Sequence, residues 1–582
     1  MNTIKPMCLR VRSRRFPLLA ATLLSAIAVK AGAQEAQITL PACSGAAVVK
    51  NEVCEIRLTA STAYANPYKN APAQVSLFFS GPSGANQKVS GFWDGSVEAG
   101  TGKTKMTVRF TPMSTGVWSY VSTSSDPGLN NKSGSFTVVG SGRGFLRRNA
   151  NRPEQFVFDN NVRMFMWGQT YYNLVTTARA GGPWKTAINQ SATNKLNKVR
   201  LLVFPFQKRD EPNECGTTPA PYPDSKPFTD ANHTVLDVQH WRRLDEVVHY
   251  LNSKQMIADL IIFSTNCPSY SPLGNVEDER YLRYVLARYA AFPNVIWCLT
   301  NEWQFAPDGA CSLPSPHPKS YWENLGSIVR AEDPWMNDTS GTRQRPLSIH
   351  QQTQHTFDFL SSSWPTHAVL QDGVRNGKFE APTFAFGDQW GNYSIRKNLG
   401  FGMPVVNDEY GYLGEKGGAY DINEHRRTIW GIALAGGYGS AGDARKDVVN
   451  GSAVDCTQPY LTSVWKGAPE YGDIARLQTY FPLVTDWWKL KSDNSVTSTD
   501  RVYVMSEPGV RYLVYSATGG SLTLNLAQLP AGNTYKVARY NPSSGAECAL
   551  MNRAGGAQSF TLASGDWVLR IETTGPALAN CS

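Results

Sequence analysis

The middle of the chain alternates between short apolar segments and amphipathic segments with helical spacing, which strongly limits the folds open to it. Residues 256–263 read Met-Ile-Ala-Asp-Leu-Ile-Ile-Phe and form a continuous apolar strand pattern. The segment before them, residues 237–252, places Val238, Trp241 and Leu244 on one face of a helix. Continuous apolar strands that alternate with helices predict a parallel sheet that is covered on both faces.

The length of this alternating region predicts a (β/α)8 TIM barrel. The region covers residues 143–494, which is enough for eight strand-helix units with long loops. The carboxyl ends of the strands of such a barrel meet at one face, where active sites lie. We expect the eight strands to end at Gln169, Phe206, Phe263, Glu302, His350, Ser361, Glu409 and Ser440.

The segments on both sides of this region show a different pattern. In residues 34–142, apolar and polar residues alternate in short runs such as Gln74–Phe79, separated by Gly- and Pro-containing turns. The same pattern returns in residues 495–582. Alternation with period two and frequent turns predicts a β-sandwich. The chain is therefore expected to belong to the α/β class, with a TIM barrel between two β-sandwich domains.

The first 33 residues have the features of a secretory signal peptide. A basic start is followed by an apolar run from Phe16 to Val29 and by the small residues Ala31-Gly32-Ala33. The apolar run is too short for a stable membrane anchor, and no second long run follows. We therefore expect a secreted or periplasmic protein with no membrane partner after cleavage.

Loss of the signal peptide changes the charge of the protein. The segment carries six basic and no acidic residues, so its removal lowers the formal net charge from +9 to +3. A chain this close to neutrality gives no electrostatic reason to expect a nucleic-acid partner. It suits a neutral or mildly charged substrate, and the sequence indicates no particular oligomeric state.

Nine of the ten cysteines remain after cleavage, in a compartment that permits disulfides. Cys43 and Cys54 flank a turn, so we expect them to be bonded. Cys548 and Cys581 are a second candidate pair. Three cysteines fall in predicted barrel loops, namely Cys215, Cys267 and Cys311. The count is odd, and Cys298 is the candidate for a free thiol because it lies inside a predicted strand. No cysteine or histidine spacing matches a zinc site, so no metal or cofactor is expected.

Two of the predicted strands carry a glutamate at their carboxyl ends. Residues 294–302 read Asn-Val-Ile-Trp-Cys-Leu-Thr-Asn-Glu, and residues 404–412 read Pro-Val-Val-Asn-Asp-Glu-Tyr-Gly-Tyr. Two carboxyl groups that face one cavity are the equipment needed to cleave a glycosidic bond. Glu302 and Glu409 are therefore the candidate catalytic residues. The alternatives are that both are structural, or that Asp408 is the working acid, although strand alternation sends Asp408 to the opposite side.

Several other side chains near the predicted strand ends are candidates for substrate binding. They are Trp167, Gln169, Trp303, His350, Tyr410 and Tyr412. Flat aromatic rings can pack on sugar faces, but the same rings can also be core. His350 either binds substrate or caps a helix. Tyr410 or Tyr412 either donates a hydrogen bond to the nucleophile or packs. Arg200 either holds the nucleophile ionised or supports the barrel.

With Asn301-Glu302 and Glu409 at the ends of predicted strands four and seven, the chain resembles glycoside hydrolase clan A. The resemblance implies that Glu302 is the acid/base, that Glu409 is the nucleophile and that Asn301 binds the sugar 2-hydroxyl. Residues 164–170 and 294–302 resemble the first and fourth strands of the apiosidase-like (β/α)8 catalytic domain. The chain departs from that family at Gln169, where Asp is usual.

The flanking segments carry their own resemblances. Phe92-Trp-Asp-Gly95 and Arg109-Phe-Thr-Pro112 are similar to a β-sandwich of unknown function that often precedes such barrels. Arg539-Tyr-Asn-Pro542 is similar to a C-terminal sandwich of the collagen-binding type, a fold that by itself does not imply a ligand.

These patterns predict a secreted retaining glycoside hydrolase that acts on a plant or microbial polysaccharide. The alternatives are an apiosidase-type enzyme that acts on pectin side chains, and a carbohydrate-binding protein that has lost activity. Retention of both glutamates argues against the last. The sugar, the linkage and the choice between endo and exo cleavage are set by loops that the sequence does not define.

Overall fold

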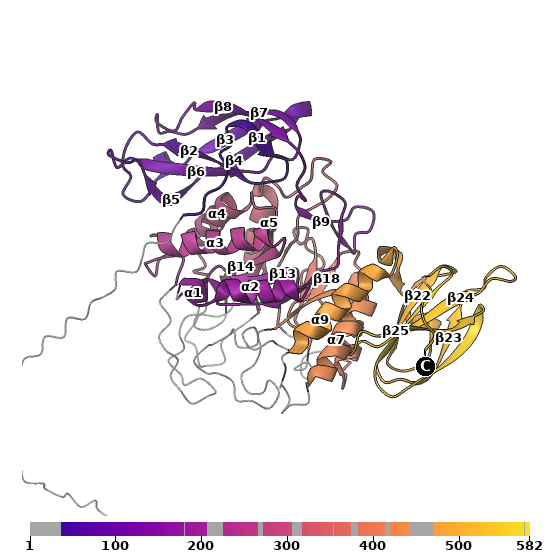
Figure 1. Ribbon diagram of the computed structural model, residues 1–582. Helices are drawn as coiled ribbons and strands as arrows, with labels where there is room; N and C mark the ends of the chain where they lie inside the picture. Colours follow the sequence, from indigo (N-terminus) through magenta and orange to yellow (C-terminus); the bar gives the residue numbers. More distant parts are fainter. Residues whose placement is uncertain are drawn as a thin grey trace, which may run out of the picture. The chain divides into compact units, whose positions relative to one another are not determined.

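The structure is a computed structural model (Figure 1). It describes residues 37–179, 181–205, 225–265, 272–304, 317–352, 354–373, 382–411, 413, 420–442, 469–575 and 577–581. The expected signal peptide at residues 1–33 lies outside these ranges. No helix within them is long and apolar enough to cross a membrane.

The central region is an eight-stranded parallel barrel, which confirms the predicted fold class. Its strands are β12 (Trp167–Thr170), β13 (Lys198–Leu202), β14 (Ile257–Ser264), β15 (Val295–Asn301), β16 (Leu347–Ser348), β17 (Ala368–Leu370), β18 (Val405–Asn407) and β19 (Tyr438–Ala441). β19 pairs with β12 and so brings the last strand beside the first. At the seam between β16 and β17, Thr366 N donates to Leu347 O at 2.9 Å and Ser348 Oγ to His367 O at 2.8 Å.

The sixth strand differs from the sequence prediction. We expected it to end at Ser361, whereas the structure places turns there and the strand at residues 368–370. A three-residue strand that is buried along its whole length offers no alternation to recognise. The expected end of the second strand, Phe206, lies outside the described residues.

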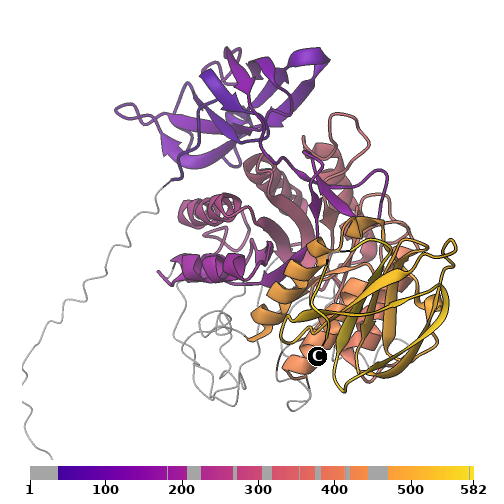
Figure 2. The ribbon, with the colours of Figure 1, turned by 45° about the vertical axis from the view of Figure 1, so that its right-hand side comes forward.

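Helices surround the barrel on its outside (Figures 1 and 2). They are α1 (Leu174–Arg179), α2 (Trp184–Thr193), α3 (Val238–Ser253), α4 (Val276–Tyr289), α5 (Lys319–Glu332), α6 (Gly387–Leu399), α7 (Ile422–Leu434) and α9 (Pro469–Tyr480). α3 begins where the sequence predicts, because the Asp237 carboxylate accepts hydrogen bonds from the N–H groups of Gln239 and His240. α4 begins with a reciprocal capping box between Asn275 and Asp278.

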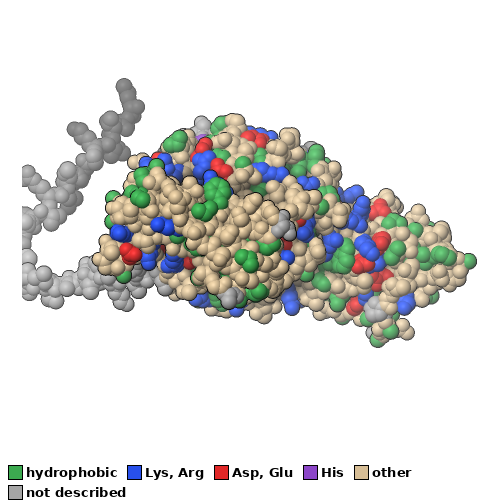
Figure 3. All heavy atoms as spheres, turned by 90° about the horizontal axis from the view of Figure 1, so that it is seen from above, with side chains coloured by type: hydrophobic (Ala, Val, Ile, Leu, Met, Phe, Trp, Pro, Cys, Tyr) green, Lys and Arg blue, Asp and Glu red, His purple; other side chains and the backbone are tan. Residues whose placement is uncertain are grey.

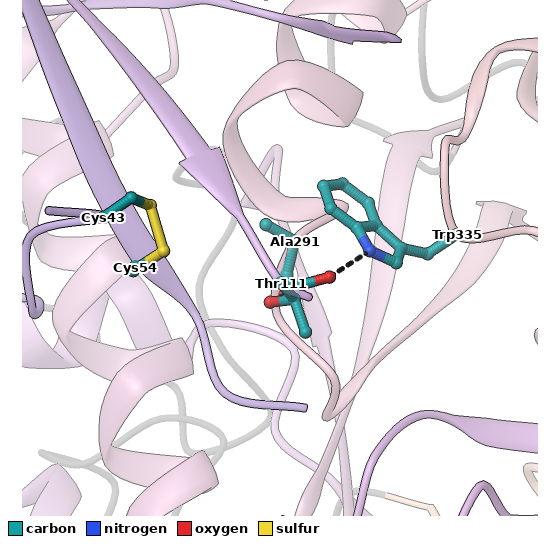
Figure 4. The surroundings of a disulfide bond; sticks show 5 residues. All are labelled: Cys43, Cys54, Thr111, Ala291 and Trp335. Atoms are coloured by element: carbon teal, nitrogen blue, oxygen red, sulfur yellow. Dashed lines mark hydrogen bonds between the residues drawn. A yellow bond between two sulfur atoms is a disulfide. The ribbon is translucent and has the colours of Figure 1, made fainter. Parts of the chain in front are cut away.

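The N-terminal region contains two β-sheets that face each other. One has the order β1 (Gly45–Val49), β8 (Ser133–Val139), β7 (Gly116–Thr123), β3 (Ser76–Ser80), β4 (Asn86–Ser90), and the other β2 (Cys54–Thr59), β6 (Thr104–Phe110), β5 (Phe92–Val97). The rings of Phe79 and Phe110 stack between the sheets with centroids 3.7 Å apart. The predicted disulfide between Cys43 and Cys54 is confirmed, with an S–S distance of 2.04 Å (Figure 4).

Buried ionic contacts join this sandwich to helices α3 and α4 of the barrel. The guanidinium of Arg109 on β6 contacts Asp245 on α3 at 2.6 Å and Glu55 on β2 at 3.0 Å. Arg288 on α4 contacts the same aspartate at 2.8 Å. Nearby, the Trp335 indole N–H donates to the carbonyl oxygen of Thr111 at 2.8 Å (Figure 4). The sandwich is therefore held to the barrel by specific polar contacts.

The C-terminal region is also rich in strands. A six-stranded sheet has the order β20 (Lys491–Ser492), β21 (Val502–Glu507), β22 (Arg511–Ser516), β27 (Trp567–Glu572), β24 (Tyr535–Tyr540), β25 (Glu547–Arg553), and β23 (Gly520–Leu526) pairs with β26 (Gly556–Leu562). The six-stranded sheet packs on α7, where the rings of Trp430 and Tyr515 stack with centroids 5.6 Å apart. Cys548 and Cys581 are bonded, as predicted. The domain boundaries at residues 142 and 494 stay predictions.

The molecular surface mixes side chains of different kinds. On the face shown in Figure 3, hydrophobic side chains are scattered among charged and polar ones. Between the N-terminal sandwich and the barrel, a small sheet of β9 (Leu146–Arg148), β10 (Phe156–Phe158) and β11 (Arg163–Met164) precedes the first barrel strand.

Candidate active site

Glu302 follows the carboxyl end of strand β15 directly. Its backbone has φ +44°, in the left-handed region that non-glycine residues rarely adopt. The hydroxyl of Thr265 holds the turn by donating to the carbonyl oxygens of Asn301 at 2.7 Å and Glu302 at 3.0 Å. Backbone conformations of this kind are concentrated at functional sites, where the surrounding structure enforces them. The turn directs the chain away from the strand at the position of the candidate acid.

Glu409 lies two residues beyond the end of strand β18 and is 6% exposed. Its Oε2 accepts a hydrogen bond from the Tyr172 hydroxyl at 2.7 Å. The Arg200 guanidinium lies 3.9 Å from the same oxygen, and the His350 Nε2 lies 3.7 Å from it. A guanidinium, an imidazole nitrogen and a hydroxyl donor thus surround one oxygen of Glu409.

Arg200 connects three barrel strands at the centre of the site. It comes from β13, is fully buried, and donates to the side-chain oxygen of Asn301 and, at 3.1 Å, to the Tyr172 hydroxyl. Burial lowers the pKa of Arg200, but nearby acidic groups outweigh it and raise this pKa above the ordinary value. Arg200 therefore stays charged and belongs to the site as well as to the barrel core.

His350 lies between the two glutamates. Its Nδ1 accepts a hydrogen bond from the backbone N–H of Glu302 at 3.2 Å. Burial, followed by the charges of Arg200 and Lys198, lowers the pKa of His350 well below its ordinary value, so the ring is neutral. A neutral ring that accepts at Nδ1 carries its proton on Nε2, the nitrogen that faces Glu409. This places His350 in the site and not at a helix end.

Tyr172 brings the two glutamates into one electrostatic environment. Burial raises the pKa of its hydroxyl well above the ordinary value, and the charges of Glu409 and Glu302 both raise it further. The Asn301 amide nitrogen lies 3.5 Å from Glu302 Oε2, so Asn301 links the acid to Arg200. The four side chains and the two glutamates form one connected group at the carboxyl face of the barrel.

Asp408, the alternative acid, points the other way. Its carboxylate is fully buried, contacts the Lys198 ammonium and accepts a hydrogen bond from Ser440 Oγ at 2.8 Å. Burial opposes ionisation, but Lys198 and then Arg200 lower the pKa of Asp408. The Asp408 carboxylate is therefore engaged by Lys198 and Ser440 inside the barrel.

Trp303 is half-buried beside Glu302, and its orientation is fixed. Its indole N–H donates to Asp358 Oδ2 at 3.0 Å, and its backbone N–H donates to His350 O at 3.0 Å. Asp358 also accepts from Gln304 at 2.5 Å and from Gln354 at 2.6 Å. These contacts lock the loops after strands β15 and β16 together around the indole.

The remaining sequence candidates lie deeper or outside the described residues. Trp167 is buried and packs against Tyr410 with ring centroids 6.0 Å apart. Gln169 is buried, and its amide donates to Gly442 O at 2.7 Å. The Tyr410 hydroxyl pairs with His425 Nε2 at 3.3 Å. Tyr412 lies outside the described residues, so substrate contacts for all four stay predictions.

Sequence reasoning missed Tyr172 as the hydroxyl that contacts Glu409. The sequence offered Tyr410 or Tyr412, which neighbour Glu409, either for this contact or for packing. Tyr172 instead follows β12, which only β19 separates from β18 in the sheet. It lies two residues beyond the first barrel strand, so its position at a strand end was a usable signal. Asp358 has no such signal, because it lies in a loop and not at a strand end.

Two further features bear on the chemistry of the site. In the described ranges, no three His, Cys, Asp or Glu side chains are grouped so that they could hold a metal ion. Cys298, the predicted free thiol, is unbonded and buried in strand β15. Burial raises the pKa of this thiol to about 12, so it is a poor nucleophile.

Comparisons with known proteins identify two domains of the chain and relate its fold to glycoside hydrolases. Residues 153–442 match the family model described as "Apiosidase-like, catalytic domain", and residues 47–125 match "Domain of unknown function (DUF5060)". The chain is similar to a "putative glycoside hydrolase" of Bacteroides vulgatus ATCC 8482, with a TM-score of 0.70 and 20% identity over 91% of this chain and 100% of that one. It is also similar to a glycoside hydrolase family 5 protein of that organism, with a TM-score of 0.56 and 17% identity over 76% and 96%. At these identities the likeness shows a shared fold. No curated protein is significantly similar in sequence.

Proposed function

We propose that this protein is a retaining glycoside hydrolase in which Glu409 is the nucleophile and Glu302 is the acid/base. The chain carries an apiosidase-like catalytic domain and has a glycoside hydrolase fold. The observation that carries this proposal is the chain of contacts that runs from Glu409 through Tyr172, Arg200 and Asn301 to Glu302. The tyrosine donates to Glu409 and lies within the electrostatic reach of Glu302. This chain of contacts supports a single site at the carboxyl face for both carboxylates.

The reaction follows from the placement of these groups. Glu302 protonates the glycosidic oxygen while Glu409 attacks the anomeric carbon, so the bond to the leaving group breaks as a bond to the enzyme forms. Glu302 then removes a proton from water, which displaces Glu409 and restores the anomeric configuration. Retention requires carboxylates about 5–5.5 Å apart, and we expect this pair to lie within about 5–6 Å. Asn301, held by Arg200, is positioned to bind the sugar hydroxyl next to the reacting carbon.

The substrate in this proposal is a plant or microbial polysaccharide or oligosaccharide. Release of a branched pentose from pectin side chains is the second candidate, because the matching family model is described as apiosidase-like. Gln169 weakens this second candidate, because it stands where the family usually has Asp. Its amide donates a hydrogen bond to Gly442 O. Export to the periplasm or the medium is part of the proposal. It is supported by the signal-like residues 1–33 and by two disulfides, which persist in oxidising compartments.

The test is a pair of measurements on Glu409→Ala. We expect the variant to lose hydrolysis of those polysaccharides in a panel that the parent protein cleaves. Added azide should restore turnover of aryl glycosides and give a glycosyl azide of inverted configuration. NMR identifies this product and its configuration. A folded Glu409→Ala protein with near-parental turnover would overturn the mechanism and favour a carbohydrate-binding protein that does not use this site catalytically.

A further inference from the structure

A large cavity lies between the N-terminal sandwich and the outer helices of the barrel. Its volume is about 860 Å³, within the usual range for ligand pockets. Strands β4 and β5 and residues 67–74 form one wall, and helix α4 with residues 331–335 forms the other. This cavity is separate from the carboxyl face of the barrel, and none of the proposed catalytic residues lines it.

Polar contacts across the cavity hold its two walls in place. The Gln87 side chain donates to Pro334 O at 2.6 Å, and the Tyr284 hydroxyl donates to Trp93 O at 2.8 Å. At the rim, the Lys69 ammonium contacts Glu277 at 3.1 Å. The buried contact of Arg109 with Asp245 lies behind this wall. The cavity is therefore a built feature, with walls from two parts of the chain.

Tyr68 presents an unused polar group to this cavity. Its side chain is 6% exposed, and its hydroxyl makes no hydrogen bond to any residue that the structure describes. The ring is held at right angles to the ring of Tyr284, with centroids 5.4 Å apart. Leaving a hydroxyl buried without a partner costs free energy. A ligand hydroxyl in the cavity would supply the missing partner.

An indole ring of fixed orientation also lines the cavity. The Trp93 ring is half-exposed, and its N–H donates to Ser96 O at 3.2 Å, which fixes the plane of the ring. Such a plane can pack against the C–H groups on one face of a pyranose. Gln74 also lines the cavity, with its amide donating to Pro67 O at 3.1 Å. The Lys88 ammonium lies 5.7 Å from the centroid of the Phe78 ring at the same wall. Rigid aromatic surface combined with a few polar groups is typical of a specific ligand site.

We propose that this cavity is a second, non-catalytic binding site for a saccharide, and that it holds a segment of the polysaccharide whose bond the barrel cleaves. Trp93 stacks on a sugar ring, Tyr68 pairs with a sugar hydroxyl, and Lys88 contacts a hydroxyl or a uronate carboxylate. The proposal rests on the proposed function for the identity of its ligand. It assigns a role to the N-terminal sandwich, which supplies one wall of the site.

Binding is tested in the Glu409→Ala background, where the substrate is not consumed. Affinity electrophoresis uses gels that contain pectin, xylan or mixed-linkage β-glucan. We expect at least one polysaccharide to retard the Glu409→Ala protein. Trp93→Ala added to that background should weaken the retardation at least tenfold, and Tyr68→Phe about threefold. Val117→Ser, an exposed change on strand β7 outside the cavity, should have no effect.

Activity measurements separate this proposal from the proposed function. In the otherwise unchanged protein, Trp93→Ala should raise KM for the polysaccharide several-fold and leave kcat on a small aryl glycoside unchanged. If Glu409→Ala keeps its activity but Trp93→Ala still weakens retardation, the mechanism fails and the second site stands. The second site is overturned if no polysaccharide retards the protein, or if neither Trp93→Ala nor the nearly isosteric Tyr68→Phe weakens the retardation.

Discussion

The Tyr172 hydroxyl donates a 2.7 Å hydrogen bond to Oε2 of Glu409, although the two residues are 237 positions apart in the chain. The contact joins the ends of the first and seventh barrel strands. It orients the carboxylate that we propose as the nucleophile. The arrangement makes Tyr172 as important to test as the glutamates themselves.

Tyr172→Phe should lower kcat/KM on the order of 100-fold, the usual effect of removing one preorganised donor from a catalytic charge. The fold should be retained, since the change removes one atom. Tyr171→Phe is the matched control, because the Tyr171 hydroxyl pairs with Ser191 and Tyr471 and does not reach Glu409. Steady-state kinetics of both variants, with circular dichroism of each, is the measurement. Equal losses of kcat/KM in both variants would show that Tyr172 has no specific role in the site.

Glu302→Gln should affect substrates according to their leaving groups. The amide cannot protonate a glycosidic oxygen, so alkyl glycosides should lose at least about 1,000-fold in kcat/KM, in line with the contribution of general acid catalysis. Dinitrophenyl glycosides leave without protonation and should keep most of their first-step rate. Stopped-flow measurement of the dinitrophenolate burst checks this. A loss that does not depend on the leaving group would contradict the acid/base role.

Arg109→Met should destabilise the protein by about 3–5 kcal/mol, because it removes one partner from a buried ionic network. Asp245 would keep Arg288, but Glu55 would lose its buried partner. Arg57→Gln is the control, since Arg57 contacts the same Glu55 with a side chain that is 37% exposed. Exposed pairs contribute less than about 1 kcal/mol. Urea unfolding of both variants gives the comparison, and similar losses would refute the prediction.

Glu470→Gln should change how stability depends on pH. Burial raises the pKa of the Glu470 carboxyl to about 7, from 4.5 in the exposed state. The unfolded chain therefore releases this proton first, so the stability that the neutral carboxyl contributes is complete below pH 4.5 and is lost as the pH rises through 7. This amounts to about 3 kcal/mol, at 1.36 kcal/mol for each pKa unit.

The glutamine cannot ionise, so Glu470→Gln should gain stability relative to the parent between pH 5 and pH 8. Unfolding free energies from urea titrations at several pH values measure this gain. Glu52→Gln, at an exposed position, should show no such trend. A constant difference between the Glu470→Gln variant and the parent across this pH range would show that Glu470 does not titrate as a buried group.

The sequence by itself determined the architecture, and it placed two candidate glutamates at strand ends. Alternation of apolar strands with amphipathic helices predicted the barrel, because each pattern can bury its apolar face in one way only. Asn301-Glu302 and Glu409 stood out as candidates because strand ends in such a barrel must meet at one face, and their catalytic roles stay predictions. The pair Cys43–Cys54 was recognisable because its cysteines are close in sequence.

Only the tertiary structure decided which side chains surround these glutamates. Tyr172, Arg200 and His350 come from different strands, and their contacts with Glu409 follow from how the parallel strands are arranged around the barrel. The sequence prediction misplaced the sixth strand, because three buried residues show no alternation of apolar and polar side chains. The cavity beside Trp93 could not be foreseen, since its walls come from segments about 190 residues apart, and the sequence does not specify which surfaces of two domains meet.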